Sequence, residues 1–139
     1  MTPASAALDP RTPVLVAVGQ VEQRVADPTD ALEPTALLAE AVRAAVADSG
    51  SSRLAEVVDT VAVIRILSHA YADPGALVAE RLGLAPRETL LTTMGGNYAQ
   101  TVLNDAARAI VAGDLDVALL TADAKLANAP GARCTFLLV

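Results

Sequence analysis

A Gly-Gly-Asn turn is the feature of this sequence best suited to chemistry. Gly95, Gly96 and Asn97 join an apolar segment to a helix-forming one. Free N–H groups at a helix start, with the positive end of the helix dipole, can hold a phosphate, a carboxylate or a developing oxyanion. The alternative is a tight turn that uses glycine for its backbone freedom, and the residues alone favour it. No P-loop lysine and no G-x-G-x-x-G spacing accompany the turn, so the usual signature of nucleotide binding is absent.

Three other side chains could carry chemistry, and each has a simpler explanation. His69 is the sole histidine, and no nucleophile for it to activate can be identified, so an ordinary loop histidine is favoured. Cys134, the sole cysteine, has no partner for a disulfide or a metal site. Asp123 follows an apolar strand, at the end of the sheet where α/β proteins bind ligands, although a solvated strand end explains it equally well. The other carboxylates show no metal-site spacing.

The segments that must position these residues alternate between strand and helix patterns. Short apolar runs rich in β-branched residues predict four strands, over 14–18, 57–66, 88–94 and 117–120. Apolar stripes at helical spacing predict three helices between them, starting near Pro34, Pro74 and Asn97 and stopping at Gly50, Gly83 and Gly113.

The order β-α-β-α-β-α-β predicts an α/β fold with a mostly parallel sheet flanked by helices. Residues 1–13 lack periodicity and predict a flexible leader. The folded domain is expected over 14–124. Residues 125–139 show neither strand nor helix period and predict an irregular tail.

Composition narrows the classes of partner. Net charge is −6, no basic stripe exists and three residues are aromatic, which argues against nucleic acid and anionic membrane surfaces. No apolar run approaches the ~20 residues of a membrane span, and no signal peptide is present, so a cytoplasmic protein is expected. Hydrophobic residues make up 53% and charged residues 19%. That balance predicts a surface partly covered by another domain or subunit.

The third predicted strand, the glycine turn and the third predicted helix resemble the nucleophile region of the thiolase superfamily. The segment 97–114 ends in Ile110-Val111-Ala112-Gly113-Asp114, similar to the Ile-x-x-Gly-Asp that closes the helix after the thiolase cysteine. The segment 95–100, Gly-Gly-Asn-Tyr-Ala-Gln, is similar to a Gly-Gly-Asn-x-x-Gln version in proteins described as acetyl-CoA acetyltransferases or sterol-carrier-type thiolases. The resemblance covers about 11–123.

The resemblance implies acyl transfer on coenzyme A thioesters in lipid metabolism, with no bound cofactor and no metal. Gly96 falls where the family carries its acyl-accepting cysteine, and Gly95, Asn97 and Gln100 are the implied binding residues around it. Gly96 has no side chain, so the covalent acyl-enzyme cannot form by the family's route. The alternative is a non-catalytic module for acyl-CoA binding or for interaction.

Family members are several hundred residues long, and their second half supplies the catalytic bases and most of the coenzyme A pocket. The chain is therefore expected to be a truncated domain that is inactive alone, through a frameshift or early stop near Lys125. Two protein partners are implied: a second copy bound through the third predicted strand, as thiolases dimerise, and a separately encoded C-terminal half.

Overall fold

The structure is a computed structural model and describes residues 7–123 and 132–138. Its strands are β1 (Ala17–Gln23), β2 (Thr60–Ile64), β3 (Glu88–Leu91), β4 (Ala118–Asp123) and β5 (Ala132–Leu138). Its helices are α1 (Pro34–Asp48), α2 (Pro74–Leu82) and α3 (Tyr98–Ala112), with 3₁₀ turns at Pro28–Asp30 and Ser52–Val57. None of the helices described has the length and apolar character to cross a membrane.

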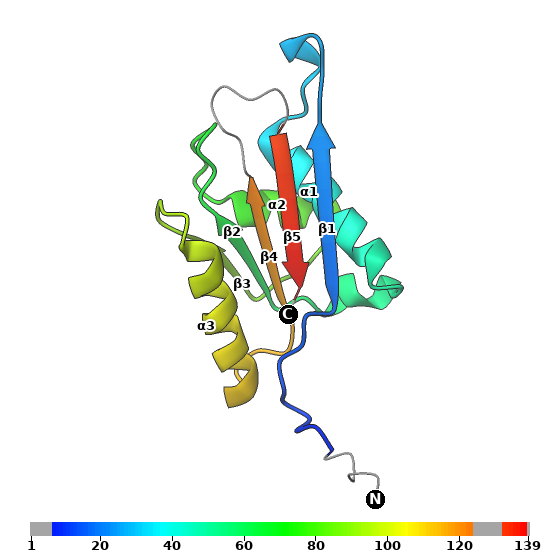
Figure 1. The fold of residues 1–139 in the computed structure, drawn as a ribbon, viewed down its shortest axis with the longest axis vertical. Helices are drawn as coiled ribbons and strands as arrows, with labels where there is room; N and C mark the ends of the chain where they lie inside the picture. The colour runs from blue at the N-terminus through cyan, green and yellow to red at the C-terminus, as the bar shows by residue number, and fades with distance from the viewer. Residues whose placement is uncertain (1–6, 124–131, 139) are drawn as a thin grey trace, which may run out of the picture.

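The strands form one sheet in the order β1-β5-β4-β2-β3 (Figure 1). β2, β3 and β4 are parallel, whereas β5 runs antiparallel to both of its neighbours. β1 therefore points in the same direction as the three parallel strands. The predicted α/β class, with a parallel sheet flanked by helices, is confirmed, and the sheet carries one reversed strand in addition.

That reversed strand corrects the prediction for the end of the chain. Residues 132–138 fall in the segment 125–139, which was expected to be irregular, yet they form β5 between β1 and β4. Residues 124–131 and 139 lie outside the described residues. A strand with neighbours on both sides is stabilised by pairing with segments that are distant in sequence. The local pattern of residues therefore did not predict β5.

The first strand also differs from its prediction. It was expected over 14–18, but β1 begins at Ala17 and extends to Gln23, through residues that were expected to form a loop. Its residues alternate: Ala17 and Gly19 are buried against α1, whereas Val18 and Gln20 are exposed. A half-covered strand needs apolar residues only on alternate positions, so the polar half of β1 was mistaken for a loop.

Two hydrophobic layers cover the sheet. α1 and α2 pack on one face, around Leu38, Val61 and Leu119. α3 packs on the other face through Val102, Ala106 and Ile110. The apolar stripes predicted for these helices supply this core, whereas Leu77 on α2 and Val111 on α3, which also belong to them, are exposed.

Candidate functional site

The turn before α3 is fixed by the ends of two parallel strands. Thr92, just past β3, is buried, and its backbone N–H donates to the carbonyl of Val63 at 3.1 Å. Its Oγ1 accepts from the backbone N–H of Arg65 at 3.0 Å. These two hydrogen bonds join the carboxyl ends of β2 and β3 directly before the glycine turn.

Gly95 and Gly96 have different roles in that turn. Gly95 has a φ of +157°, and a Cβ added there would lie 2.9 Å from Asn97 Oδ1 and 3.0 Å from the Tyr98 ring. Its carbonyl accepts from Tyr98 N–H at 3.2 Å, which closes the turn. Gly96 is exposed, and a Cβ added there would have nothing within 4 Å. The fold therefore requires glycine at 95, whereas position 96 has room for a side chain.

α3 starts directly after this turn. Its first internal hydrogen bond runs from Thr101 N–H to the Asn97 carbonyl at 3.1 Å, so the N–H groups of Ala99 and Gln100 precede the helical ladder. Asn97 stands at the N-cap position, as predicted, but its side chain makes no capping hydrogen bond. Gln100 lies in the first turn and donates from Nε2 to Asn104 Oδ1 at 2.9 Å, along the helix.

The β2–α2 loop, 65–73, lies at the same carboxyl end of the sheet. Ser68 Oγ donates to Asp123 Oδ2 at 3.3 Å, which ties the loop to the end of β4. His69 is exposed, and its ring lies against Tyr71 with centroids 4.5 Å apart and planes 55° apart. His69 and Asp123 therefore both lie at the carboxyl end of the sheet, as the glycine turn does. Each contacts a residue of this loop: His69 contacts Tyr71, and Asp123 contacts Ser68.

A four-residue polar network, which we call the Glu33 clasp, holds the other end of that loop. The Glu33 carboxylate accepts from Tyr71 OH, from Arg81 Nη2 at 2.6 Å and from Thr35 Oγ1 at 2.6 Å, and Arg81 Nε donates to Thr35 Oγ1 at 3.2 Å. The clasp thus joins the start of α1 and the last turn of α2 to the β2–α2 loop.

The clasp shifts the pKa values of its acidic groups in opposite directions. Partial burial acts to raise the pKa of Glu33, but hydrogen bonds from Thr35 and Tyr71 and the charge of Arg81 outweigh it and hold that pKa below its usual value. Burial, with the hydrogen bond to Glu33 and its negative charge, raises the pKa of Tyr71 to about 12. The phenol therefore stays protonated as a donor and Glu33 stays ionised as an acceptor.

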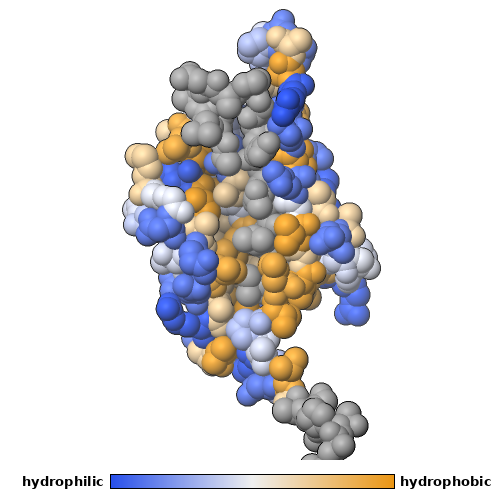
Figure 2. Space-filling model, viewed as in Figure 1, coloured by the Kyte–Doolittle hydropathy of each residue, from blue (hydrophilic) through white to orange (hydrophobic). Residues whose placement is uncertain are grey.

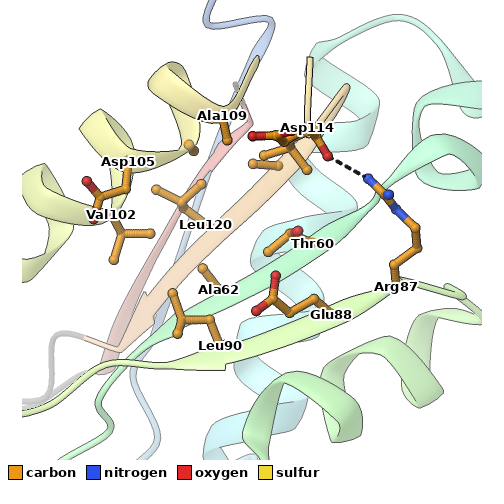
Figure 3. A pocket seen from close by; sticks show the side chains of 13 residues that line it. Thr60, Ala62, Arg87, Glu88, Leu90, Val102, Asp105, Ala109, Asp114 and Leu120 are labelled. Atoms are coloured by element: carbon orange, nitrogen blue, oxygen red, sulfur yellow. Dashed lines mark hydrogen bonds between the residues drawn. The ribbon is translucent and has the colours of Figure 1, made fainter. Parts of the chain in front are cut away.

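A groove of about 520 Å³ runs along α3, between this helix and strands β2 and β3 (Figure 3). Its floor includes Leu90, Val102 and Leu120. Carboxylates and one cation surround that floor: Glu88, Asp105, Asp114 and Arg87, whose Nη2 donates to the Asp114 carbonyl at 3.0 Å. The excess of negative charge disfavours a phosphate-bearing ligand in this groove.

The described residues contain no group of three or more His, Cys, Asp or Glu side chains placed to hold a metal ion. Sequence reasoning missed the Glu33 clasp and Thr92. Glu33 and Tyr71 lie 38 residues apart, and neither motif nor periodicity connects them. The turn itself could be found because glycines between a strand and a helix form a local pattern.

No family model matches the sequence, and no curated protein matches it. Solved structures do match. A monomeric SCP2-thiolase like protein type 1 from Mycobacterium smegmatis is 30% identical, with a TM-score of 0.73 over 86% of this chain and 25% of that one. The chain thus spans about a quarter of that protein's length.

More distant matches show the same fold. Xanthomonas campestris OleA with bound lauric acid and lauroyl-CoA is 15% identical, with a TM-score of 0.65 over 81% of this chain and 41% of that one. A β-ketoacyl-[acyl carrier protein] synthase III from Thermus thermophilus is 18% identical, with a TM-score of 0.65 over 90% and 50%. The chain therefore has a thiolase-like fold and corresponds to part of the length of the thiolase-like proteins that it matches.

Proposed function

We propose that this chain is the portion of a thiolase-like acyl-CoA acetyltransferase that carries the nucleophile turn, and that it is inactive alone. The parent activity is acyl transfer on coenzyme A thioesters in cytoplasmic lipid metabolism. The observation that carries the proposal is Gly96, which occupies the strand-to-helix turn in front of α3 and has no nucleophilic side chain.

The turn keeps one half of the required chemistry. The first N–H groups of α3 and the positive end of its dipole favour a thioester oxygen or a carboxylate there. A covalent acyl-enzyme needs a thiol or hydroxyl at the turn, and Gly96 supplies neither. The expected behaviour is therefore binding of an acyl-CoA without turnover.

The test is incubation of the purified full chain with acetoacetyl-CoA and coenzyme A. Disappearance of the enolate absorbance of acetoacetyl-CoA, as it is cleaved to two acetyl-CoA, would measure turnover, and calorimetry would measure binding. Saturable binding without turnover supports the proposal. Gly95→Ala should weaken the binding of acetoacetyl-CoA, because the added Cβ collides with Asn97 and Tyr98. Turnover above background would overturn the assignment of inactivity.

The alternative function is a non-catalytic interaction module. β3 is an edge strand of four residues, Leu90 on it is half-exposed, and the groove described above opens beside it. An edge with free backbone groups favours pairing with another strand. The implied partners are a second copy through β3 or a separately encoded C-terminal half. The M. smegmatis relative is described as monomeric, so edge pairing is not general among similar proteins.

Self-pairing and binding to a second half can be separated by one variant. Leu90→Glu places a charge beside the β3 edge and should abolish a β3 dimer in sedimentation experiments. If the chain is monomeric but co-purifies with a co-expressed C-terminal portion of a thiolase-like relative, the second-half partner is supported instead.

A further inference from the structure

The β2–α2 loop is held at both of its ends. At its start, Arg65 N–H donates to Thr92 Oγ1 at 3.0 Å, directly after β3. At its end, Asp73 Oδ2 accepts from Thr89 Oγ1 at 2.8 Å, on β3 itself. Its middle is bound to the end of β4 and to the Glu33 clasp. The loop backbone is therefore fixed, and the side chains that it carries are presented in defined positions.

A small hollow lies against this loop, on the α2 side of the sheet. Its volume is about 10 Å³, which admits one water-sized atom. It is lined by Arg65, His69 and Tyr71, together with apolar residues that include Ile66, Pro74 and Leu91. Ile66 and Leu91 also pack in the core beneath α1 and α2, which places the hollow on that face. A hollow of this size can hold a single oxygen atom of a ligand whose remainder stays in solvent.

Arg65 gives this hollow a positive charge, and no carboxylate is among the residues that line it. The Arg65 side chain is exposed, and within the described residues its guanidinium forms no ion pair and no hydrogen bond. His69 adds a ring N–H, and among those same residues its ring contacts Tyr71 without a hydrogen bond. The hollow thus has two side-chain donors available to a ligand, in a chain whose net charge is −6.

The carboxylates nearest to the loop are bound to other donors. Asp73 accepts from the first turn of α2 through one oxygen and from Thr89 Oγ1 through the other. The Glu33 carboxylate is paired with Arg81 in the clasp. Asp123, at the end of β4, accepts from the β2–α2 loop. None of these three carboxylates lines the hollow, so none lies directly against the positive charge there.

The fold supports the positions of both donor residues. The His69 and Tyr71 rings lie with their centroids 4.5 Å apart and their planes 55° apart. Tyr71 in turn donates to Glu33, so the clasp supports the ring against which His69 lies. Arg65 is fixed at its backbone by Thr92. Preorganisation of this kind lowers the entropy cost of binding, and the apolar walls of the hollow strengthen an ionic contact.

The surface of the loop suits a polar ligand better than an apolar one. Figure 2 shows hydrophobic and hydrophilic residues interspersed at the upper left, where this loop and the glycine turn lie in Figure 1. Along the loop, the exposed Leu67 stands between the exposed Arg65 and His69 in sequence. Polar side chains thus flank the apolar one, and the loop does not form the continuous apolar patch of a protein docking surface.

We propose that Arg65 and His69 form a subsite for a phosphate group. One phosphate oxygen enters the hollow and accepts hydrogen bonds from the Arg65 guanidinium and from a ring nitrogen of His69, while the other oxygens stay in solvent. Arginine is suited to this role because its charge and its several N–H donors match a phosphate.

The phosphate is either free inorganic phosphate or a phosphate of coenzyme A, and binding experiments distinguish the two sources. The subsite lies on the α2 side of the sheet, whereas the glycine turn leads into α3 on the other face. It goes beyond the proposed function, because it needs no nucleophile and no reaction at the turn.

The first experiment measures the binding of inorganic phosphate and of coenzyme A to the full chain by calorimetry at low salt. Arg65→Gln should raise the Kd roughly tenfold and His69→Gln roughly fivefold, because a hydrogen bond from a charged donor contributes more than one from a neutral donor. Arg53→Gln is the matched control. Arg53 is an exposed arginine in the 3₁₀ turn before β2, it forms no ion pair within the described residues, and its loss should leave the Kd unchanged.

The pattern of binding identifies the source of the phosphate. Binding of inorganic phosphate that Arg65→Gln weakens and Arg53→Gln does not supports a site for free phosphate. Binding of coenzyme A alone, with the same response, supports the site and identifies coenzyme A as the source. No saturable binding of either compound overturns the proposal, as does equal weakening by Arg65→Gln and Arg53→Gln.

Acetoacetyl-pantetheine, which has no phosphate, separates this subsite from the proposed function. Its binding should be the same in wild type and Arg65→Gln, because it reaches the turn without the subsite. Failure of acetoacetyl-pantetheine to bind would count against the proposed function and would leave the phosphate result unaffected.

The second experiment observes His69 in the unaltered protein. Because His69 is the sole histidine, its imidazole proton signals are assigned in an NMR spectrum without a variant. Titration with whichever of the two compounds binds should shift these signals with the Kd found by calorimetry, whereas sodium chloride at equal ionic strength should not. Imidazole signals that stay unchanged in a sample that binds the compound would overturn the position of the site.

Discussion

At the scale of single residues, the two glycines of the turn differ in what they determine. Gly95 is needed for the backbone conformation, whereas Gly96 leaves the turn without a nucleophilic side chain. Position 96 has space and an ordinary backbone conformation, so Gly96→Cys should fold and should place a thiol at the start of α3. The helix N-terminus stabilises the thiolate, so we expect a pKa below the usual ~8.5. The pH dependence of iodoacetamide labelling in a Cys134→Ser background measures it, with Ala112→Cys at the helix C-terminus as the matched control.

The same variant tests the truncation. Gly96→Cys alone should not restore thiolysis of acetoacetyl-CoA, because a reactive thiol without the bases supplied elsewhere cannot complete the cycle. An equal thiol pKa at positions 96 and 112 would argue against the helix field, whereas measurable thiolysis would argue against the need for a second half.

A third glycine is required for packing. An added Cβ at Gly19 would lie 2.3 Å from the Ala41 carbonyl oxygen and 2.4 Å from the Ala45 nitrogen, both in the backbone of α1. Gly19→Ala must therefore push α1 away from β1, and we expect it to lower the free energy of unfolding by about 2 kcal/mol or more. Gly96→Ala, which meets no atoms, should change it by less than about 0.5 kcal/mol. Chemical denaturation of the two variants measures both free energies of unfolding. Equal values would contradict the close approach of β1 to α1.

At the scale of elements, the Glu33 clasp connects α1, α2 and the β2–α2 loop. Because folding lowers the pKa of Glu33, its contribution to stability is present above the usual pKa of 4.5 and is lost as pH falls through the lower, folded value. Glu33→Gln should remove that acid dependence and lower stability at pH 7 by about 1 kcal/mol, a small figure because the pair is half-exposed. Unfolding measured from pH 3 to 7 tests this.

The control for the clasp is Glu40→Gln, which breaks an exposed pair with Arg43 and should leave the acid limb in place. Tyr71 gives a second readout with the opposite sign. Its raised pKa means that its contribution is complete below pH 10 and is lost as pH rises through about 12, so Tyr71→Phe should flatten the alkaline limb. An acid limb that is identical in Glu33→Gln and wild type would show that other carboxylates cause it.

Helices and strands differ in how far the sequence predicted them. α2 begins where its signals placed it, since Asp73 Oδ1 accepts from Ala76 N–H at 2.9 Å and Pro74 follows, and it ends at Gly83 with φ +66°. Such caps are local chemistry and are readable in sequence. β1 and β5 depend on each other, across more than a hundred residues of chain, and were misplaced or missed. The candidate site divides in the same way: its turn was found, and the distant contacts that brace its rim were not.

At the scale of the whole molecule, β5 joins two parts of the sheet. β1 pairs only with β5 within the described sheet, and β5 in turn pairs with β4, so removal of β5 separates β1 from β2, β3 and β4. A chain ending at Asp123 would expose the core around α1 and leave β1 with no strand partner. Since natural domains have only ~5–15 kcal/mol of stability, we expect this truncation to abolish cooperative unfolding.

Circular dichroism melting and amide hydrogen exchange measure that outcome, with deletion of residues 1–6 as a control that leaves every described contact intact. If β5 is the strand that holds β1, slowly exchanging amides in β1 and β4 should lose protection together in the truncated chain. A truncated chain that melts at the temperature of the full chain would mean that α1 alone fixes β1 through the close contact at Gly19. The Gly19→Ala substitution would then unfold the truncated chain. The two results together decide whether pairing with β5 or packing on α1 holds β1 in place.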